Sequence, residues 1–468
     1  MVSSKDMQRR QKISKEESCP EKVAVQPQEY PGAPSISMAQ TKTDHHDKQY
    51  RLLEDILARK NMLNALRKVE SNKGAPGIDG MEVPDLRKNL KREWQFTKSI
   101  LLSGTYTPMP VREVKIPKPD GGVRTLGIPT ATDRMIQQAV SQKLSPIFDK
   151  DFSDYSYGFR PKRSAHGAVL KAKEYIEEGY KWVVDIDIEK FFDRVNHDML
   201  MARVARKVVD KRVLKLVRAY LNAGAMRNGV VIEKHEGTPQ GGPLSPLLSN
   251  IFLDDFDKEL DRRGHKYVRY ADDCNIYLKS KRAAERTYES IVRFIEEKLK
   301  LKVNAKKSKV DSAYRIKFLG YGYYATEKGK VSLRLGTGVA KRQQDKIRQI
   351  TRRNRGRSLD SVIKEINVAM TGFINYFKLA DMTEFLVRLE KWIRRKLRVI
   401  VWKHWKKPRS KFRKLKGMGL TIQQACMAWC RKKYWRLSKT PQLNTVMGIS
   451  YFRERGLINL VERYSLIR

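Results

Sequence analysis

The sequence predicts an α+β protein in which strands and helices are interspersed up to about Gly336 and helices alone follow. Residues 265–270 and 274–277 are short, rich in β-branched and aromatic side chains, and are typical of the two strands of a hairpin. Residues 182–186 form a third apolar strand, which leads directly to Asp187. Beyond Gly336 the strand pattern stops, and apolar residues recur at helical spacing among many basic ones.

The N-terminal end divides into a leader and a first helix. Residues 1–48 lack periodic apolar spacing and are rich in Lys, Glu, Gln, Ser and Pro, which predicts a disordered or loosely attached leader. Order is expected from about Tyr50. One helix should follow and end before the turn-rich loop 74–80. Its apolar stripe is Leu52, Leu53, Ile56, Leu57, Met62, Leu63 and Leu66.

Residues 111–124 are predicted to form a hairpin, because alternating residues flank a Pro-Asp-Gly-Gly turn. Arg112, Lys118 and Arg124 recur every six residues, so strand alternation plus one turn can bring them onto one face. Three cations on one face would clamp a triphosphate. An ordinary exposed basic hairpin fits this segment by itself equally well.

The loop 237–246 contains too much glycine and proline for regular structure, and an amphipathic helix is expected after Pro246. A loop with few side chains at a helix start lets a nucleic acid approach the backbone closely. Gln240 would then contact a nucleotide or the template. Taken alone, the segment is only a turn.

The predicted strands and helices combine into a split βαβ unit, an antiparallel sheet backed by helices. Its helices are two across 197–221, one after Pro246 and one over 281–299. In this arrangement Asp187 lies near Asp272 and Asp273 at the hairpin tip. Three carboxylates from two strands suit two Mg²⁺ ions roughly 3.5–4 Å apart, the arrangement of nucleotidyl transfer. Asp185 is an alternative upstream ligand, and a solvated acidic turn is the simplest alternative for the pair.

The excess of basic over acidic residues indicates a polyanionic partner. The 468 residues contain 97 Lys and Arg against 52 Asp and Glu, a formal charge of +45. From 341 to 468 there are 33 basic and 8 acidic residues, and from 391 to 440 there are 18 basic residues, seven aromatic ones and no acidic one. Basic residues interleaved with aromatic ones favour nucleic-acid binding over a merely solvated surface.

The four cysteines do not form a disulfide framework, and Cys426 and Cys430 are expected to be buried thiols rather than zinc ligands. No apolar run reaches the 18 or so residues of a membrane span. The sequence thus predicts no membrane partner and an intracellular location.

The motifs occur in the order that characterises one protein family. They are 74–80, the basic hairpin through Ile128-Pro129, 157–161 leading to Asp187, 237–246, 270–273, 304–308, 318–321, and then 372–377 and 392–397. From about Tyr50 to the C-terminus the chain resembles a bacterial group II intron-encoded reverse transcriptase and maturase. The resemblance implies a right-hand polymerase with fingers and palm, followed by an α-helical thumb and maturase domain.

The resemblance also implies roles for individual residues. Asp187, Asp272 and Asp273 would be the catalytic, metal-binding triad. Phe192 would lie under the sugar and exclude a ribose 2′-hydroxyl, although it can also be simply a core residue. Lys307 would protonate the departing pyrophosphate, and the neighbouring Lys306 is the alternative for this role. The incoming nucleotide would be surrounded by Arg112, Lys118, Arg124 and Gln240, and the primer end positioned by the strand 318–321. The RNA would be bound by Arg394, Arg395 and Lys396.

The implied domains are the leader 1–48, an N-terminal extension with fingers over 49–180, and the palm over 181–335. A thumb and maturase domain follows over 336–415, and a basic DNA-binding-like region over 416–468. The palm would copy RNA into DNA, and the helical part would bind the intron RNA to assist splicing and retrohoming. The implied partners are the intron RNA, a DNA target and primer, and dNTPs, in a bacterial cytoplasmic, nucleoid-associated ribonucleoprotein. Whether the protein is monomeric or dimeric stays open.

Many relatives carry a C-terminal nuclease domain rich in Cys and His, and the only histidine beyond His265 is His404, so this version is expected not to cut the second DNA strand. Two alternatives remain. A maturase with a vestigial polymerase is disfavoured by the intact carboxylates. A domesticated reverse transcriptase of phage defence or CRISPR spacer acquisition is disfavoured by the maturase motifs.

Overall fold

The computed structural model describes residues 51–117, 122–227, 230–232, 236–238, 240–327, 329–353 and 356–468. The predicted leader and Lys118 lie outside the described residues.

The N-terminal elements precede the carboxylate-bearing strands in the sequence. They are α2 (Leu52–Leu57), α3 (Arg59–Asn72), η1 (Val83–Asp85), α4 (Leu86–Leu102), β1 (Val111–Pro117), β2 (Val123–Ile128), α5 (Ala131–Asp149) and α6 (Ala165–Glu177). The one helix predicted from Leu52 is in fact two, because Ala58 has extended backbone angles (φ −57°, ψ 136°). Both still pack on α5.

The middle of the chain contains most of the strands. Its elements are β3 (Trp182–Ile186), α7 (Phe191–Arg194), α8 (His197–Ala205), α9 (Lys211–Asn222), β4 (Ala225–Arg227), β5 (Val230–Ile232), α10 (Ser245–Arg262), β6 (Lys266–Tyr270), β7 (Asp273–Leu278), α11 (Lys281–Glu297), β8 (Lys309–Ser312), β9 (Lys317–Phe318), β10 (Tyr321–Ala325) and β11 (Val331–Leu335).

The last part of the chain is helical in its described residues, which confirms the expected change near Gly336. Its elements are α12 (Val339–Ile350), α13 (Leu359–Tyr376), α14 (Thr383–His404), α15 (Pro408–Gly417), α16 (Ile422–Ala425), η2 (Cys426–Trp429), α17 (Tyr434–Leu437), α18 (Pro441–Val446), α19 (Ile449–Arg453) and α20 (Leu460–Ile467).

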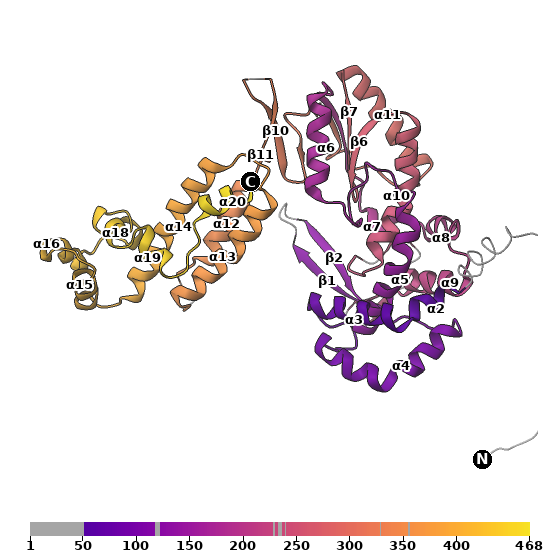
Figure 1. Cartoon of the computed structure of the whole chain (residues 1–468), viewed down its shortest axis with the longest axis horizontal. Coiled ribbons are helices and arrows are strands. Elements are labelled where there is room, and N and C mark those ends of the chain that lie inside the picture. Colours follow the sequence, from indigo (N-terminus) through magenta and orange to yellow (C-terminus); the bar gives the residue numbers. More distant parts are fainter. Residues whose placement is uncertain are drawn as a thin grey trace, which may run out of the picture. The chain divides into compact units, whose positions relative to one another are not determined.

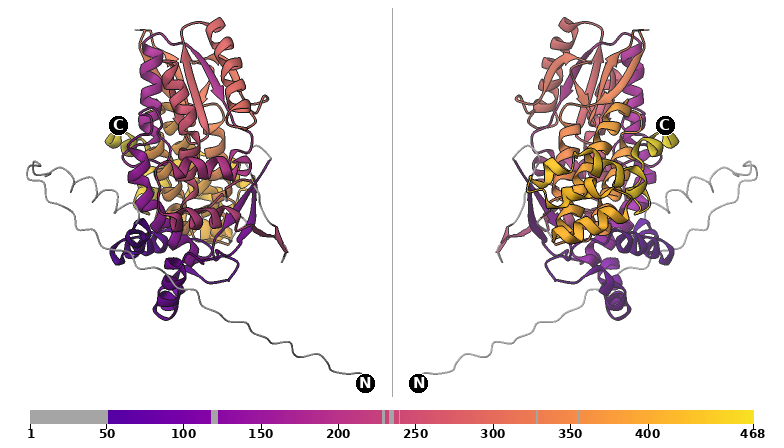
Figure 2. Two further views of the ribbon diagram at one scale, coloured as in Figure 1. Left: turned by 90° about the vertical axis from the view of Figure 1, so that its right-hand side faces the viewer. Right: turned by 90° about the vertical axis from the view of Figure 1, so that its left-hand side faces the viewer.

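The central sheet has the strand order β6-β7-β3-β8, and its paired strands are antiparallel, as predicted. Alternate residues of each strand face opposite sides. Val184 and Ile276 join the core with α5 and α10, whereas Val183 and Tyr277 join the core with β10 and the C-terminal helices. Helix α11 packs on β3, β7 and β8, and α6 packs on β6 (Figures 1 and 2). The sheet is therefore covered on both faces.

The basic hairpin is present as predicted. Strands β1 and β2 pair antiparallel, with Arg112 opposite Ile128 and Ile116 opposite Arg124. This register places Arg112 and Arg124 on the same face, because residues an even number apart share a face and directly opposed residues do as well. Strand β1 also pairs with β4, in parallel, so the hairpin is anchored to the middle of the chain.

The segment 318–321 is not the strand that the sequence suggested. Leu319 and Gly320 have positive φ angles of 50° and 82° and form a turn between β9 and β10. This turn contacts the helical part, since the Tyr376 hydroxyl donates a hydrogen bond of 3.0 Å to the Leu319 carbonyl. The Tyr321 hydroxyl in turn donates to the Tyr376 carbonyl, so α13 is tied to the sheet β9-β10-β11.

Helix α14 carries the apolar stripe that its spacing predicted. Leu386, Leu389, Ile393, Leu397 and Ile400 are buried, whereas Trp392 is only half-buried. The prediction for the cysteines was wrong, because Cys426 is exposed and Cys430 half-buried in the short elements after α15. None of the described helices is long and apolar enough to cross a bilayer.

Candidate active site and nucleic-acid interface

The carboxylates come together where β3 meets the β6–β7 hairpin. In the β3–β7 register Asp185 lies opposite Asn275 and Ile186 opposite Cys274. Asp187 directly follows the last residue of β3, and Asp273 is the first residue of β7, so both lie at this end of the paired strands. Asp185, Asp187 and Asp273 line one open cavity of about 650 Å³, the carboxylate pocket, together with the turn 318–320.

The two-residue turn of the hairpin is held in an unusual backbone conformation. Tyr270 pairs with Asp273, and between them Ala271 has a positive φ of 57°. A non-glycine residue in this region is strained and persists only where its surroundings hold it. The backbone of Gly158 approaches so closely that a Cβ atom there would lie 2.3 Å from the Ala271 nitrogen.

A buried polar network holds that turn. The Arg269 guanidinium donates to the Ala271 carbonyl (2.8 Å) and to the Asn250 side-chain oxygen (3.1 Å). It also forms a bidentate ion pair with Asp257, in which both side chains are buried. Asn250 donates to the Gly158 carbonyl (2.8 Å), which closes the loop of contacts. Helix α10 therefore determines where Asp272 and Asp273 lie.

Asp187 is held from the other side by the segment 304–308. The Asp187 backbone nitrogen donates to the Ser308 hydroxyl (2.9 Å), and its carbonyl accepts from the Asn304 nitrogen (2.8 Å). Its carboxylate accepts from the Asn304 side chain (3.1 Å) and forms an ion pair with Lys307 (3.6 Å). A cationic side chain thus already balances part of the negative charge in the carboxylate pocket.

Crowding of the carboxylates disfavours their charged forms. Burial, together with the charges of Asp272, Asp185 and Asp187, raises the pKa of Asp273 to about 7. Burial raises the pKa of Asp185 to about 6, with Asp187 adding to the shift and Lys309 opposing it. The pKa of Asp272 is also raised, mainly by burial and then by Asp187. A bound cation would relieve this repulsion.

A second cavity, the nucleotide pocket, has a volume of about 510 Å³. It is lined by Arg124, Phe192 and Gln240, together with Phe159 and Arg134. The Gln240 carbonyl accepts from the Gly127 nitrogen (2.8 Å), which fixes the loop 240–242 against β2. Gly241 is required there, because a Cβ atom would lie 2.6 Å from the Gly127 oxygen.

The two pockets are linked electrostatically. The charge of Arg124 lowers the pKa of Asp272, although burial still raises that pKa overall. Arg112 does not line the nucleotide pocket. Burial lowers the pKa of Arg134, and the charge of Arg112 adds to that shift while Asp79 opposes it. Within the described part of the chain, buried guanidinium nitrogens of Arg112 and Arg134 have no hydrogen-bond partner. Unpaired buried donors of this kind are suited to an anionic ligand.

The three basic residues predicted to bind RNA do not share one face of α14. Arg394 forms an ion pair with Glu390, and both side chains are only 12% exposed. Arg395 and Lys396 instead line a third cavity with Trp392, Val399, Trp435 and residues 348 and 351–353. We call this cavity the basic-aromatic pocket.

Comparison with known proteins agrees with this geometry. Residues 116–323 match the family model described as "Reverse transcriptase (RNA-dependent DNA polymerase)", and residues 340–419 match "Group II intron, maturase-specific domain". The chain is 37% identical over 308 residues to Protein YkfC of Escherichia coli K12, covering 57% of this chain and 81% of that protein. It is 31% identical over 418 residues to the group II intron-encoded protein LtrA of Lactococcus lactis subsp. cremoris, covering 68% of each.

The chain belongs to the group II intron-encoded reverse transcriptases and maturases. It is an RNA-directed DNA polymerase that also carries the splicing-assistance domain of this family. Among solved structures it is similar to a "Partial Cas6-RT-Cas1--Cas2 complex", with 26% identity, a TM-score of 0.34, and 52% of this chain and 42% of that chain covered.

Reverse transcriptase domains use divalent metal ions, and the donor set of the carboxylate pocket fits them. Its oxygen ligands are hard, and burial together with the neighbouring carboxylates raises the pKa values of Asp185 and Asp273, a cost that a bound cation would offset. No three His, Cys, Asp or Glu side chains among the described residues are close enough to form a ready cage. Asp187 and Asp273 line one pocket with Asp185, whereas Asp272 is not among its lining residues.

The structure of the reverse transcriptase also brings in residues that received no role from the sequence. Phe159 is 55% exposed in the nucleotide pocket, with a positive φ of 58° and its ring 6.3 Å from that of Tyr270. Arg134 and Asn304 were missed as well. Phe159 and Asn304 lie inside recognised motifs, so motif membership could have identified them. Arg134 lies inside α5, where only its unpaired buried nitrogens distinguish it.

Proposed function

We propose that this reverse transcriptase extends a DNA primer at the carboxylate pocket, with two Mg²⁺ ions held by Asp187, Asp272 and Asp273. The observation that carries the proposal is that Asp187 and Asp273 line one pocket and that Asp272 directly precedes Asp273 in the hairpin turn. Asp185 lines the same pocket but already has a partner, since the Asn275 amide in its favoured orientation donates to it (2.9 Å). Asp185 is therefore a supporting carboxylate.

Each addition is an in-line displacement at phosphorus. The primer 3′-oxygen forms a bond to the α-phosphorus of a dNTP, the bond from that phosphorus to the bridging oxygen breaks, and pyrophosphate leaves. The two ions would stabilise the attacking and departing oxygens. Lys307, beside Asp187, gives a proton to the leaving pyrophosphate. The proton of the 3′-hydroxyl passes to solvent.

The nucleotide pocket receives the dNTP. Arg124 lines this pocket and its charge acts on Asp272, so it would bridge the triphosphate and the carboxylates. Arg134 lines the same pocket, and Arg112 is near enough for its charge to act on Arg134. Lys118, which the sequence predicts to be in the same hairpin, lies outside the described residues. Phe192 limits space at the sugar, and Gln240 is in position to contact the nucleotide or the template.

We propose that the polymerase and RNA-binding functions belong to different domains. Residues 49–180 form the N-terminal extension and fingers, 181–335 the palm, and 336–415 the thumb and maturase domain that binds the group II intron RNA. The basic region 416–468 contacts target DNA during intron mobility. We infer that the protein and its intron RNA form a ribonucleoprotein in the bacterial cytoplasm, associated with the nucleoid. Its proposed partners are the intron RNA, a DNA target with its primer, and dNTPs.

Primer extension on a primed RNA template tests the polymerase proposal. Asp272→Ala should abolish DNA synthesis while leaving affinity for the RNA template nearly unchanged, because it removes a metal ligand and no phosphate-binding group. Asp261→Ala, which removes an exposed carboxylate at the end of α10, is the matched control and should behave like the unaltered protein. Undiminished synthesis by Asp272→Ala would refute the assignment.

A further inference from the structure

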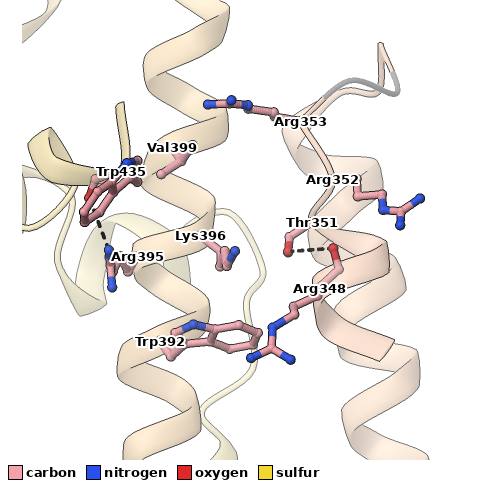
Figure 3. Close-up of a pocket in the computed structure, with 9 residues that line it drawn as sticks. All are labelled: Arg348, Thr351, Arg352, Arg353, Trp392, Arg395, Lys396, Val399 and Trp435. Atoms are coloured by element: carbon pink, nitrogen blue, oxygen red, sulfur yellow. Dashed lines mark hydrogen bonds between the residues drawn. The ribbon is translucent and has the colours of Figure 1, made fainter. Parts of the chain in front are cut away.

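The basic-aromatic pocket is separate from the carboxylate and nucleotide pockets in its lining residues. It has a volume of about 760 Å³, within the range of small-molecule sites, which is about 300–1,000 Å³. Trp392, Arg395, Lys396 and Val399 line it from one face of α14, at the spacing i, i+3, i+4 and i+7. The opposite wall comes from Arg348, at the end of α12, and the residues 351–353 that follow (Figure 3).

The pocket concentrates positive charge without a compensating carboxylate. Its lining contains five cationic side chains and no acidic one: Arg348, Arg352, Arg353, Arg395 and Lys396. Arg348 is paired with Asp345 outside the lining. The other four form no ion pair with any described residue. The pKa of Lys396 is lowered by burial and then by Arg348, Arg395 and Arg353, so the cations repel one another.

This cluster is not explained by helix stability. Cations near the C-terminus of α12 do stabilise the helix dipole, which accounts for Arg348 and Arg352. Arg395 and Lys396 lie in the middle of α14, where that effect is absent. The neighbouring Arg394 shows how an ordinary helix cation is accommodated, since Glu390 lies one turn before it.

Two indole rings complete the lining. Trp435 of α17 is 46% exposed, and Trp392 is half-buried, so neither ring is fully used in core packing. Arg395 lies 5.8 Å from the centre of the Trp435 ring, and Arg348 and Lys396 lie 5.7 and 5.4 Å from that of Trp392. Figure 3 shows Arg348 and Arg353 reaching across the gap toward α14, whereas Arg352 points away from it.

We propose that the basic-aromatic pocket binds one unpaired nucleotide of the intron RNA, with its base stacked on Trp392 or Trp435 and its flanking phosphates on Arg353, Arg395 and Lys396. The proposal rests on the proposed maturase function, and it names the kind of RNA element that the maturase domain recognises together with Trp435 of the basic region 416–468. An unpaired nucleotide offers both an exposed aromatic face and phosphate charge, which are the two kinds of group that the lining complements. The bases of a continuous duplex are stacked on one another and could not reach the rings.

Binding of short oligonucleotides to the full chain tests the stacking. The probes are an oligouridylate and an abasic ribose-phosphate strand of the same length. The unaltered protein should bind the oligouridylate more tightly, and Trp435→Ala should weaken that binding by about 5- to 150-fold, with little effect on the abasic strand. Trp435→Phe should restore much of the loss because it keeps an aromatic face. Trp429→Ala is the matched control, since Trp429 is 50% exposed and lies outside the pocket.

Ultraviolet cross-linking locates the site independently of any variant. A 5-iodouridine-containing strand should cross-link to peptides that contain Trp392 or Trp435, and mass spectrometry identifies them. Equal losses for Trp435→Ala and Trp429→Ala, or cross-links that avoid both pocket tryptophans, would overturn the proposal. Tighter binding of the matching oligothymidylate than of the oligouridylate would reassign the pocket to single-stranded DNA and would equally overturn it.

The maturase function can be judged separately in the same preparation. If intron RNA is bound better than unrelated RNA but Trp435→Ala changes nothing, the pocket proposal fails and the maturase function stands. If oligouridylate binding depends on Trp435 but intron RNA is not preferred over unrelated RNA, the maturase proposal fails instead. DNA synthesis on a short primed RNA template should be unaffected by Trp435→Ala in either case.

Discussion

Asp273 is held where its negative charge is disfavoured. Its pKa of about 7 is well above the usual value for an aspartate, which is about 3.9. The folded protein therefore binds a proton at this residue more readily than the unfolded chain does. Without divalent cations, Asp273 therefore lowers the free energy of unfolding as pH rises from about 4 to about 7. In this range its carboxyl is ionised in the unfolded chain but still protonated in the folded protein. Ionising Asp273 therefore costs stability, as expected for a carboxylate placed to bind a cation.

Replacing Asp273 should show directly how much its ionisation lowers the stability of the folded protein. In metal-free buffer, Asp273→Asn should raise the melting temperature at pH 8 and change it much less at pH 5, where the native carboxyl is already neutral. Thermal unfolding followed by circular dichroism measures the difference. Adding Mg²⁺ should stabilise the unaltered protein at pH 8 more than the variant. A variant that is less stable than the parent at pH 8 would contradict the interpretation.

Phe192 lines the nucleotide pocket, and we propose that its ring excludes a ribose. Its ring lies 5.3 Å from that of Phe191, in an edge-to-face arrangement that fixes its position. Phe192→Ala should increase the incorporation of ribonucleotides relative to deoxynucleotides by about 10-fold or more, because a steric clash is removed. Steady-state primer extension with single nucleotides measures the ratio. Unchanged discrimination would leave Phe192 as a packing residue only.

The hairpin β6–β7 depends on elements that precede it in the chain. The strained Ala271 turn is fixed by Arg269, by Asn250 of α10 and by the close approach of Gly158. Breaking a buried ion pair such as Arg269–Asp257 typically costs about 3–5 kcal/mol, so replacing either partner endangers the whole fold. A test of the turn by itself therefore needs a smaller change.

Gly158→Ala is such a change. The added methyl group would meet the Ala271 nitrogen at 2.3 Å, so the turn with Asp272 and Asp273 must shift. A displacement of about 1 Å at an active site can cost about 10²-fold in rate. We expect primer extension to fall on that order, while RNA affinity is retained. Gly372→Ala is the control, because it meets no atom within 4 Å inside α13 and should be neutral or stabilising.

The whole protein carries a formal charge of +45, and the way that charge is paired matters more than its total. Arg394 has its counter-ion in Glu390, whereas Arg395 and Lys396 face a pocket without acidic groups. Cations without a carboxylate partner gain most from phosphate, because they break no ion pair to bind it. Arg395 donates instead to the Trp435 carbonyl (3.3 Å).

The salt dependence of RNA binding should distinguish Arg395 and Lys396 from Arg394. Arg395→Ala with Lys396→Ala should reduce the log–log slope of affinity against salt by about 0.7 to 0.9 for each phosphate that the variant no longer neutralises. Arg394→Ala should change the slope less, because Glu390 already compensates that charge. Filter binding of intron RNA over a salt series gives the slopes. A larger effect from Arg394→Ala would mean that its ion pair opens on binding.

The sequence by itself determined the order of the elements, the strands that carry the carboxylates, the basic hairpin and the family. Local spacing encodes these features, because strand alternation, helical stripes and turn residues act over a few positions. It also indicated Asp187, Asp272 and Asp273 as candidates, because the motifs around them resemble those of the family, although an acidic turn by itself is weak evidence.

Only the tertiary structure decided which side chains meet. The pairing of β3 with β7 brings Asp187 and Asp273 to one pocket and gives Asp185 a separate partner in Asn275. Packing of α10 and Gly158 holds the turn, and helix rotation divides Arg394 from Arg395 and Lys396. Arg134 and Trp435 became candidates only through an unpaired buried nitrogen and an exposed ring. These contacts join residues far apart in the chain, and no local pattern specifies the distance between them.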